Sequence, residues 1–284
     1  MQNPAWMVFW IAVLLAVALA ALFTVNGARF QERVRREGRR RLRSAGPTRD
    51  LVPDETGRLP APVQRYLTLA IRDRARSVCS VRLRHGGRFR TRPGGGWLPI
   101  RGEQYFAADP PAFLWWGRLR VGPGVWVDAR DQLVDGRASL EARLESTITV
   151  GNAAGPEIDQ GGMLRLLGEM VWFPTSFADE RFVSWEAIDD RTADAALSHH
   201  GREVEATFHF RRDGLPRMVT AQRYRDTPRG AVLTPWTAKL DDYRLIDGLL
   251  VPLDVEARWH LDSGDWPYAQ FKVERIEYDR RDAF

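Results

Sequence analysis

The chain has 284 residues and a formal net charge of +5, and this charge is unevenly distributed. Eight arginines and two glutamates between Arg29 and Arg43 carry a net +6, which leaves −1 for the rest of the chain. Because a nucleic-acid-binding surface needs basic residues spread over the folded domain, this pattern argues against nucleic acid as a partner. The single cysteine, Cys79, excludes an intramolecular disulfide framework, so burial of apolar surface must stabilise the fold.

An uncharged apolar run opens the chain. From Ala5 to Val25 it contains 21 residues without a charged side chain. An α-helix needs roughly 20 apolar residues to cross the ~30 Å hydrocarbon core of a bilayer. A cleaved secretory signal is not expected, because no residue before Arg29 supplies the basic n-region and the apolar run is full length. Residues 1–28 are therefore predicted to form a transmembrane anchor that is retained in the cell membrane.

The arginine-rich segment lies directly after this anchor. Residues 29–58 are predicted to form a juxtamembrane segment and a linker, the latter from Ser44 to Arg58, where glycines and prolines interrupt any periodicity. Positive residues beside a span are retained on the cytoplasmic side and attract anionic lipid headgroups by up to roughly 1 kcal/mol per residue. We therefore expect a single-pass protein with its N-terminus outside, its large domain in the cytoplasm and the lipid bilayer, with its anionic headgroups, as a partner.

Residues 59–284 are expected to form one domain. Leu59 to Ile71 predicts a short helix, because Val63, Tyr66, Leu67 and Ala70 share one face. From Val78 onward apolar and polar residues mostly alternate in short segments, which predicts around ten antiparallel strands. The first two of these strands are expected to flank a turn at residues 85–87. Such a meander curls into a barrel, a half-barrel or a strongly twisted sheet.

One segment departs from the β pattern. Residues from Ile158 to Trp172 have apolar side chains at helical spacing, with Asp159 as a candidate N-cap and Pro174 just beyond the end. We expect this helix to pack on the sheet. The predicted class is therefore α+β, mainly β: an N-terminal transmembrane helix followed by a curved antiparallel sheet, or half-barrel, with a packing helix.

Several motifs in this domain resemble those of a known family. The helix carries R-x-L-x-E-x-x-W-x-P, and later strands carry W-x-x-I-D, P-W-x-x-x-x-x-D-Y and G-x-x-V-P, at Arg165–Pro174, Trp185–Asp189, Pro235–Tyr243 and Gly248–Pro252. In this order they resemble a functionally uncharacterised bacterial family of single-span membrane proteins. The resemblance implies no activity. It implies an architecture similar to the half-barrels of the LolA and LolB lipoprotein carriers, which cradle acyl chains.

The helix motif has two interpretations. Arg165 and Glu169 are four residues apart on one helix face, with Trp172 a further turn along, so an ion pair beside an indole is expected. This pair either buttresses the helix against the sheet or supplies, in Glu169, a carboxyl group with a raised pKa for general acid–base catalysis. Hydrolysis would require a second carboxylate, for which the candidates are Asp189, Asp190, Asp241, Asp242 and Glu256.

No metal or cofactor site is expected. His199, His200 and His209 lie near two glutamates, but strand alternation directs His209 outward, and His199 and His200 fall at a turn. His85 is also assigned to a turn. The P-loop, dinucleotide-binding, C-x-x-C, H-E-x-x-H and G-x-S-x-G motifs do not occur in the sequence.

Tryptophans are the remaining functional signal. Nine of the eleven lie in the domain, where they either fill the concave side of the sheet or line a cavity for an apolar ligand. The candidate ligand-binding residues are Trp126 and Trp236, which are expected to face inward, together with Trp172, Arg165, Glu169 and Tyr243.

The leading interpretation is a membrane-anchored binding domain for a lipid-like or apolar ligand, with no reaction assigned. The alternatives are a hydrolase that uses Glu169 with a sheet carboxylate, and a non-enzymatic membrane scaffold. An empty concave face with facing carboxylates would favour hydrolysis, and a filled one would favour the scaffold.

Trp115 and Trp116 are adjacent on one strand, so their side chains must lie on opposite faces of the sheet.

Overall fold

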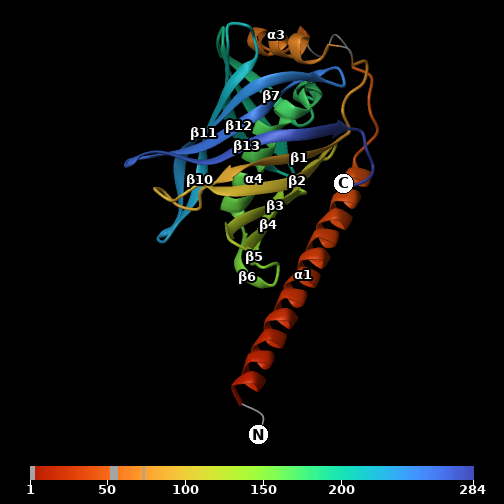
Figure 1. The fold of residues 1–284 in the computed structure, drawn as a ribbon. Coiled ribbons are helices and arrows are strands. Elements are labelled where there is room, and N and C mark those ends of the chain that lie inside the picture. Colours follow the sequence, from red (N-terminus) through yellow and green to blue (C-terminus); the bar gives the residue numbers. More distant parts are fainter. Residues whose placement is uncertain (1–3, 52–56, 73) are drawn as a thin grey trace.

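The computed structural model of the protein describes residues 4–51, 57–72 and 74–284. Its largest elements are one long helix and one curved sheet, which lie beside each other (Figure 1). Helix α1 extends from Pro4 to Ser44 without interruption, so the apolar run and the arginine-rich segment form a single helix. Residues 52–56 of the predicted linker lie outside the described residues.

The described residues form 13 strands in a single sheet, in which every neighbouring pair is antiparallel. Their order is β6-β5-β4-β3-β2-β1-β13-β12-β11-β10-β9-β8-β7, so the first and last strands pair in the middle and β6 and β7 form the edges. The strands are β1 (Ser80–Phe89), β2 (Leu98–Ala108), β3 (Pro111–Gly122), β4 (Val125–Val134), β5 (Arg137–Leu144), β6 (Ile148–Ala154), β7 (Val183–Asp189), β8 (Thr192–His199), β9 (Arg202–Phe210), β10 (Pro216–Thr227), β11 (Gly230–Ile246), β12 (Leu249–Leu261) and β13 (Gly264–Tyr278).

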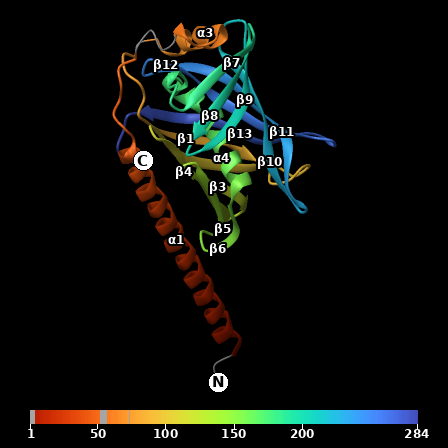
Figure 2. The same ribbon diagram turned by 180° about the vertical axis from the view of Figure 1, so that it is seen from behind.

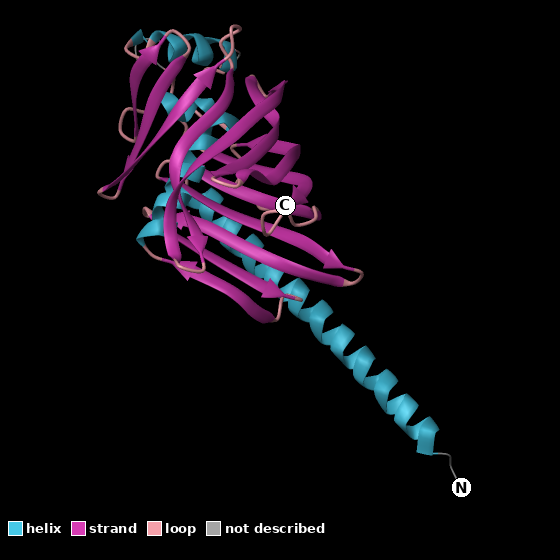
Figure 3. Ribbon diagram, turned by 90° about the vertical axis from the view of Figure 1, so that its left-hand side faces the viewer, coloured by secondary structure: helices cyan, strands magenta, loops and turns pink. Residues whose placement is uncertain are grey.

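Figure 2 shows helix α4 (Pro156–Glu169) inside the curve of this sheet, and Figure 3 shows α1 passing along the outside. The predicted class, mainly β with an N-terminal helix and a packing helix on a curved antiparallel sheet, is confirmed. Helix α4 begins after Gly155 rather than at the predicted cap. Asp159 instead accepts a hydrogen bond from the backbone N–H of Ala138 at 2.6 Å, because it lies one turn inside the helix and points at β5.

The two faces of the sheet contact different helices. Trp115 belongs to the main core with α4, whereas Trp116 packs with Phe30 and Val34 of α1. The expectation that these adjacent indoles diverge is therefore correct. Helix α1 approaches the sheet closely at Gly38, where an added Cβ would lie 2.7 Å from the Tyr105 ring. Ion pairs from Arg33 to Glu141 at 2.6 Å and from Arg130 to Glu37 at 2.6 Å also join this helix to the sheet.

The predicted turn at residues 85–87 is wrong. Strand β1 continues through these residues, and His85 is buried with 3% of its surface exposed. The glycines are there because β1 passes close to β13: a Cβ at Gly87 would lie 2.1 Å from the Gln270 carbonyl oxygen. A glycine pair therefore marks a close backbone approach here, which the sequence pattern alone does not distinguish from a turn.

Short helical elements lie before the first strand of the sheet and after helix α4. Helix α3 (Ala61–Ala70) buries the predicted stripe of Val63, Tyr66, Leu67 and Ala70. The 3-10 segments Met170–Trp172 and Pro174–Ala178 follow α4.

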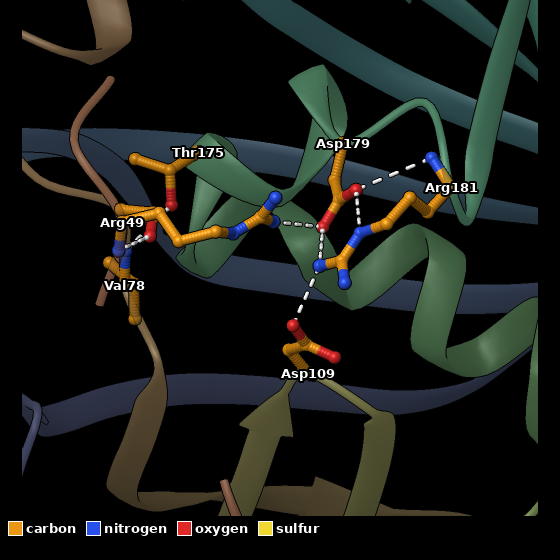
Figure 4. Close-up of polar contacts among 7 residues, drawn as sticks. Arg49, Val78, Asp109, Thr175, Asp179 and Arg181 are labelled. Atoms are coloured by element: carbon orange, nitrogen blue, oxygen red, sulfur yellow. Dashed lines mark hydrogen bonds and ion pairs between the residues drawn. The ribbon is translucent and has the colours of Figure 1, made fainter. Parts of the chain in front are cut away.

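A partly exposed ion-pair network connects Arg49, in the chain that follows α1, to Asp179 and to the β2–β3 turn (Figure 4). Asp179 binds both Arg49 and Arg181, and Arg181 also binds Asp109 at 2.6 Å. These guanidinium groups hold the pKa of Asp179 below its usual value, although partial burial opposes them. The network has a structural role, because it ties the segment between the helices to the β2–β3 turn.

Candidate functional site

A cavity of about 370 Å³ lies between α4 and the concave face of the sheet. Its wall is mostly apolar, because the inward-facing positions of eight strands carry aliphatic or aromatic side chains. The apolar side chains of the wall are those of Phe89, Ile100, Trp115, Leu119, Val127, Ala129, Leu140, Ala142, Val171, Trp172, Trp236, Ala238, Leu240, Val255, Ala257, Ala269 and Phe271. The concave face is therefore not completely filled.

Arg165 of α4 is the centre of a polar network in the wall. Its Nε lies 2.8 Å from Glu169 Oε1 and its Nη1 lies 2.9 Å from Asp131 Oδ2. Nη2 donates to Gln104 Oε1 at 3.2 Å, and Gln104 Nε2 donates to Glu169 Oε2 at 2.6 Å. Both oxygens of Glu169 are thus hydrogen-bonded, and the network joins α4 to β2 and β4.

The carboxyl groups of this network have perturbed acidity. Burial raises the pKa of Glu169 above its ordinary value, while Arg165 opposes this shift. Burial likewise raises the pKa of Asp131 against the opposing charges of Arg165 and Arg223. Arg165 also lies over the rings of Phe113 and Trp115, 5.0 and 5.1 Å from their centroids. The guanidinium of Arg165 is therefore held by three polar partners and two aromatic rings.

The predicted ligand-binding residues separate into two sets. Arg165, Glu169, Trp172 and Trp236 line the cavity. Tyr243 does not, because it packs elsewhere in the core and donates a hydrogen bond to the Pro216 carbonyl at 2.6 Å.

Trp126 was expected to face inward, and this is wrong. Its indole Nε1 lies 3.2 Å from Asp128 and 3.1 Å from Ser146, beside α1. The reason is register: strand alternation places Val127 and Ala129 in the cavity wall, so Trp126 and Asp128 point to the opposite face.

The carboxylates proposed as partners for Glu169 lie elsewhere. Asp189, Asp190, Asp241, Asp242 and Glu256 are absent from the described cavity wall, whose acidic residues are Asp131 and Glu169. Asp131 was overlooked, although its position two residues after Ala129 and two before Leu133 on an alternating strand places it on the inner face. Arg223 and Tyr268 are further polar residues of the wall that sequence reasoning missed.

The three histidines that the sequence places near glutamates lie at two separate positions. His199 and His200 meet Asp135 from the β4–β5 turn, with ligand atoms within 4.8 Å of one another. His200 and Asp135 are exposed and lie 3.5 Å apart, as in an ordinary surface pair. His209 lies on β9 next to Thr220, at 3.0 Å.

Residues 50–271 match the model of a family of unknown function, DUF6544. The chain belongs to this family. The match confirms the resemblance to a functionally uncharacterised family, and no activity comes with membership of DUF6544. No curated protein matches the chain.

Solved structures similar to this DUF6544 chain have low sequence identity to it. A LolA superfamily protein from Nitrosomonas europaea is 11% identical, with a TM-score of 0.38, and the match covers 76% of this chain and 91% of that one. A DUF1329 family protein from Desulfovibrio piger is 12% identical, with a TM-score of 0.42 and coverages of 81% and 94%. A β-barrel-like DUF1849 protein from Brucella abortus is 11% identical, with a TM-score of 0.24 and coverages of 71% and 98%. These likenesses assign no function to the chain.

Proposed function

We propose that this protein is a membrane-anchored binding domain that holds a lipid-like, apolar molecule between its sheet and helix α4. Residues 1–28 would anchor it, residues 29–58 would connect it to the membrane surface, and residues 59–284 would hold the ligand. The single observation that carries the proposal is the apolar cavity of about 370 Å³. Ligand pockets typically measure about 300–1,000 Å³ and are lined mainly by apolar and aromatic groups.

The amino-terminal half of α1 supports the membrane location. Its most apolar 18-residue window has a mean hydropathy of 2.8, and none of that window is buried against the domain. The residues after it are packed on the sheet from Gly27 onward. The basic flank favours a cytoplasmic domain and an N-terminus outside. Arg29, which lies close to the end of the apolar run and is exposed, forms no ion pair among the described residues, which leaves it available to anionic headgroups.

Ile148 and Val150 of strand β6 form an apolar rim beside the point where the exposed, apolar half of α1 ends. Asn26 donates a hydrogen bond to Thr147 Oγ1 at 3.0 Å, so the β5–β6 turn lies beside the end of the apolar run. Ile148 and Val150 on the adjoining strand are 54% and 56% exposed. Because they lie next to the end of the span, we propose that this rim contacts the bilayer surface.

The alternatives have less support. A hydrolase needs a carboxylate that is free to transfer a proton, and both oxygens of Glu169 are hydrogen-bonded by Arg165 and Gln104. A scaffold needs no cavity in its core. Ligand binding accounts for the unfilled space.

Gly168 gives a direct test, because it lines the cavity and an added Cβ would meet no heavy atom within 4 Å. The full chain in lipid nanodiscs should bind dansyl-undecanoic acid saturably, with energy transfer from tryptophan. Gly168→Leu should fill the cavity and weaken binding at least about tenfold, while its melting temperature stays equal or rises because leucine has the higher helix propensity, by ~1 kcal/mol. Gly168→Ala is the matched control and should retain binding. Undiminished binding by Gly168→Leu would refute the proposal.

A further inference from the structure

Arg223 is the charged group of the cavity wall that has no carboxylate partner. The charged side chains of the described wall are Asp131, Arg165, Glu169 and Arg223. Arg165 binds both carboxylates, whereas Arg223 forms no ion pair among the described residues. Among the described residues its guanidinium donates a hydrogen bond to the Tyr268 hydroxyl oxygen, from Nη1 at 3.4 Å. The Nε and Nη2 groups of Arg223 therefore retain unused donors.

Tyr268 adds a second donor at the same place. Its hydroxyl oxygen accepts hydrogen bonds from Trp236 Nε1 at 3.0 Å and from Arg223 Nη1. Its own O–H proton has no acceptor within the described part of the chain. Since a phenol has one donor and a guanidinium five, the two side chains present several N–H and O–H groups without an oxygen to receive them.

Aromatic rings fix the position of this guanidinium. Arg223 Cζ lies 5.4 Å from the Trp236 ring centroid and 5.9 Å from that of Trp259. Helix α4 also comes close to the guanidinium, because a Cβ added at Gly161 would be 3.3 Å from Arg223 Nε. The glycine thus leaves room for the arginine between the helix and the sheet. A guanidinium held in this way loses little conformational entropy when it binds a ligand.

We propose that the cavity takes a single-chain amphiphile whose anionic headgroup, a carboxylate or a phosphate ester, is bound by Arg223 and Tyr268. This inference rests on the proposed function, because the tail occupies the apolar cavity. Carboxylates and phosphates match the planar fork of arginine with two parallel hydrogen bonds. Arg165 does not compete for the headgroup, because its own donors already bind Glu169, Asp131 and Gln104.

Cavity size and charge support the same class of ligand. A volume of about 370 Å³ lies near the lower end of the range for small-molecule pockets, which suits one chain rather than two. Both carboxyl groups of the wall are bound by Arg165, which leaves the guanidinium of Arg223 without a carboxylate partner in the described wall. An anionic headgroup would supply that partner.

The test compares ligands that share one tail. Full-length protein in nanodiscs is loaded with dansyl-undecanoic acid, which is then displaced with hexadecanoate, hexadecyl phosphate, hexadecanol or hexadecylamine. The wild type should bind at least one of the two anions at least about tenfold more tightly than the alcohol, as a charge-assisted hydrogen bond predicts. The preferred anion distinguishes carboxylate from phosphate. Partition into the disc lipid is common to all variants and cancels between them.

The variants separate headgroup recognition from tail binding. Arg223→Gln should bring the anion down to the affinity of hexadecanol without changing the latter, and Tyr268→Phe should reduce the preference in part. Arg217→Gln, an exposed arginine on the same strand, removes the same charge and should keep the preference. Arg223→Lys, which keeps the charge but not the fork, should retain a reduced preference and serves if the glutamine variant does not fold.

Two outcomes overturn the inference and leave the proposed function standing. One is equal binding of hexadecanol and both anions by the wild type, or an unchanged preference in Arg223→Gln. The other is a preference for hexadecylamine, which would assign the headgroup site to the carboxylates. If the dansyl probe does not bind and none of the competing ligands displaces it, the proposed function itself is refuted.

Discussion

The indole Nε1 of Trp115 donates a hydrogen bond to Nε2 of His85 at 2.8 Å, and both side chains are buried. Because Nε2 is the acceptor, the imidazole must be neutral. Burial lowers the pKa of His85 to about 3, and the nearby charge of Arg165 adds to this shift. The histidine is therefore a packing and hydrogen-bonding group behind the cavity wall.

Acid should destabilise the protein through this histidine. The folded pKa of His85 is about 3 and its ordinary value is 6.5, so the unfolded chain binds the proton first. The contribution of His85 to the free energy of unfolding is present in full above pH 6.5. It decreases as the pH is lowered toward 3, by up to roughly 1.4 kcal/mol per pH unit. Glu169 and Asp131 act in the opposite direction, because their folded pKa values are raised.

The measurement is denaturant unfolding of the wild type and His85→Gln at pH 7 and pH 4.5. Between these pH values the wild type should lose roughly 2 kcal/mol more than the variant, since the carboxyl contributions are common to both and cancel. Equal losses would show that His85 does not stay neutral in the folded protein.

The sequence pattern was sufficient to predict the class of the fold, because the buried side chains of individual elements follow their apolar periodicity. Alternation predicted strands such as β9, where Val204, Ala206 and Phe208 are buried, and the helical spacing at Leu164 and Leu167 predicted α4. The turn assigned to residues 85–87 failed because glycine serves both turns and close strand contacts. Only the neighbouring strand, which comes from almost 200 residues later in the chain, decides between them.

The site was predictable in part for a related reason. The spacing of Arg165 and Glu169 predicted their ion pair, because both lie on one helix. Asp131 and Arg223 come from strands far apart in sequence, so their proximity to that helix depends on the register of the sheet. The inward assignment of Trp126 failed for the same reason, since a shift of one residue reverses the face.

The Arg165–Glu169 pair should act as a buttress. Glu169→Gln removes one carboxylate from a nearly buried network in which Arg165 is 16% exposed. Uncompensated breakage of a buried pair costs about 3–5 kcal/mol, and because Asp131 remains bound we expect a smaller loss of about 1–3 kcal/mol. Denaturant unfolding of the full chain measures this.

Glu186→Gln on exposed strand β7 is the matched control and should change stability by less than about 0.5 kcal/mol. Unchanged stability in Glu169→Gln, accompanied by altered affinity for the dansyl probe, would contradict the buttress and make Glu169 a ligand contact.

Two tryptophans should separate binding from packing. Trp236→Ala removes a cavity-wall indole that also donates to Tyr268, so probe affinity should fall at least about tenfold. Trp126→Ala removes an indole on the other face and should lower stability while leaving probe affinity unchanged. If Trp236→Ala loses about 3–5 kcal/mol of stability with no effect on probe binding, its role is core packing alone.

Orientation is tested by fusions at the C-terminus. With the arginine-rich flank retained on the inner side, alkaline phosphatase fused there should be inactive and a fluorescent protein fused there should be bright. An active phosphatase with a dark fluorescent protein would place the domain outside the cytoplasm.

The apolar rim should rest on the bilayer. The chain has one cysteine, Cys79, which is buried, so a bimane label can be placed on a new cysteine at Ile148 without a competing site. In nanodiscs containing lipids spin-labelled near the headgroup, this label should be quenched strongly, because Thr147 is hydrogen-bonded to Asn26 at the end of the apolar run. Ile188 on β7, at the opposite edge of the sheet, is 55% exposed, and a label there is the control that should not be quenched. Equal quenching at both positions would mean that the domain has no fixed orientation on the membrane. Quenching at Ile148 alone is expected, because the packing of α1 against β2 and β3 fixes the position of the domain relative to the apolar run.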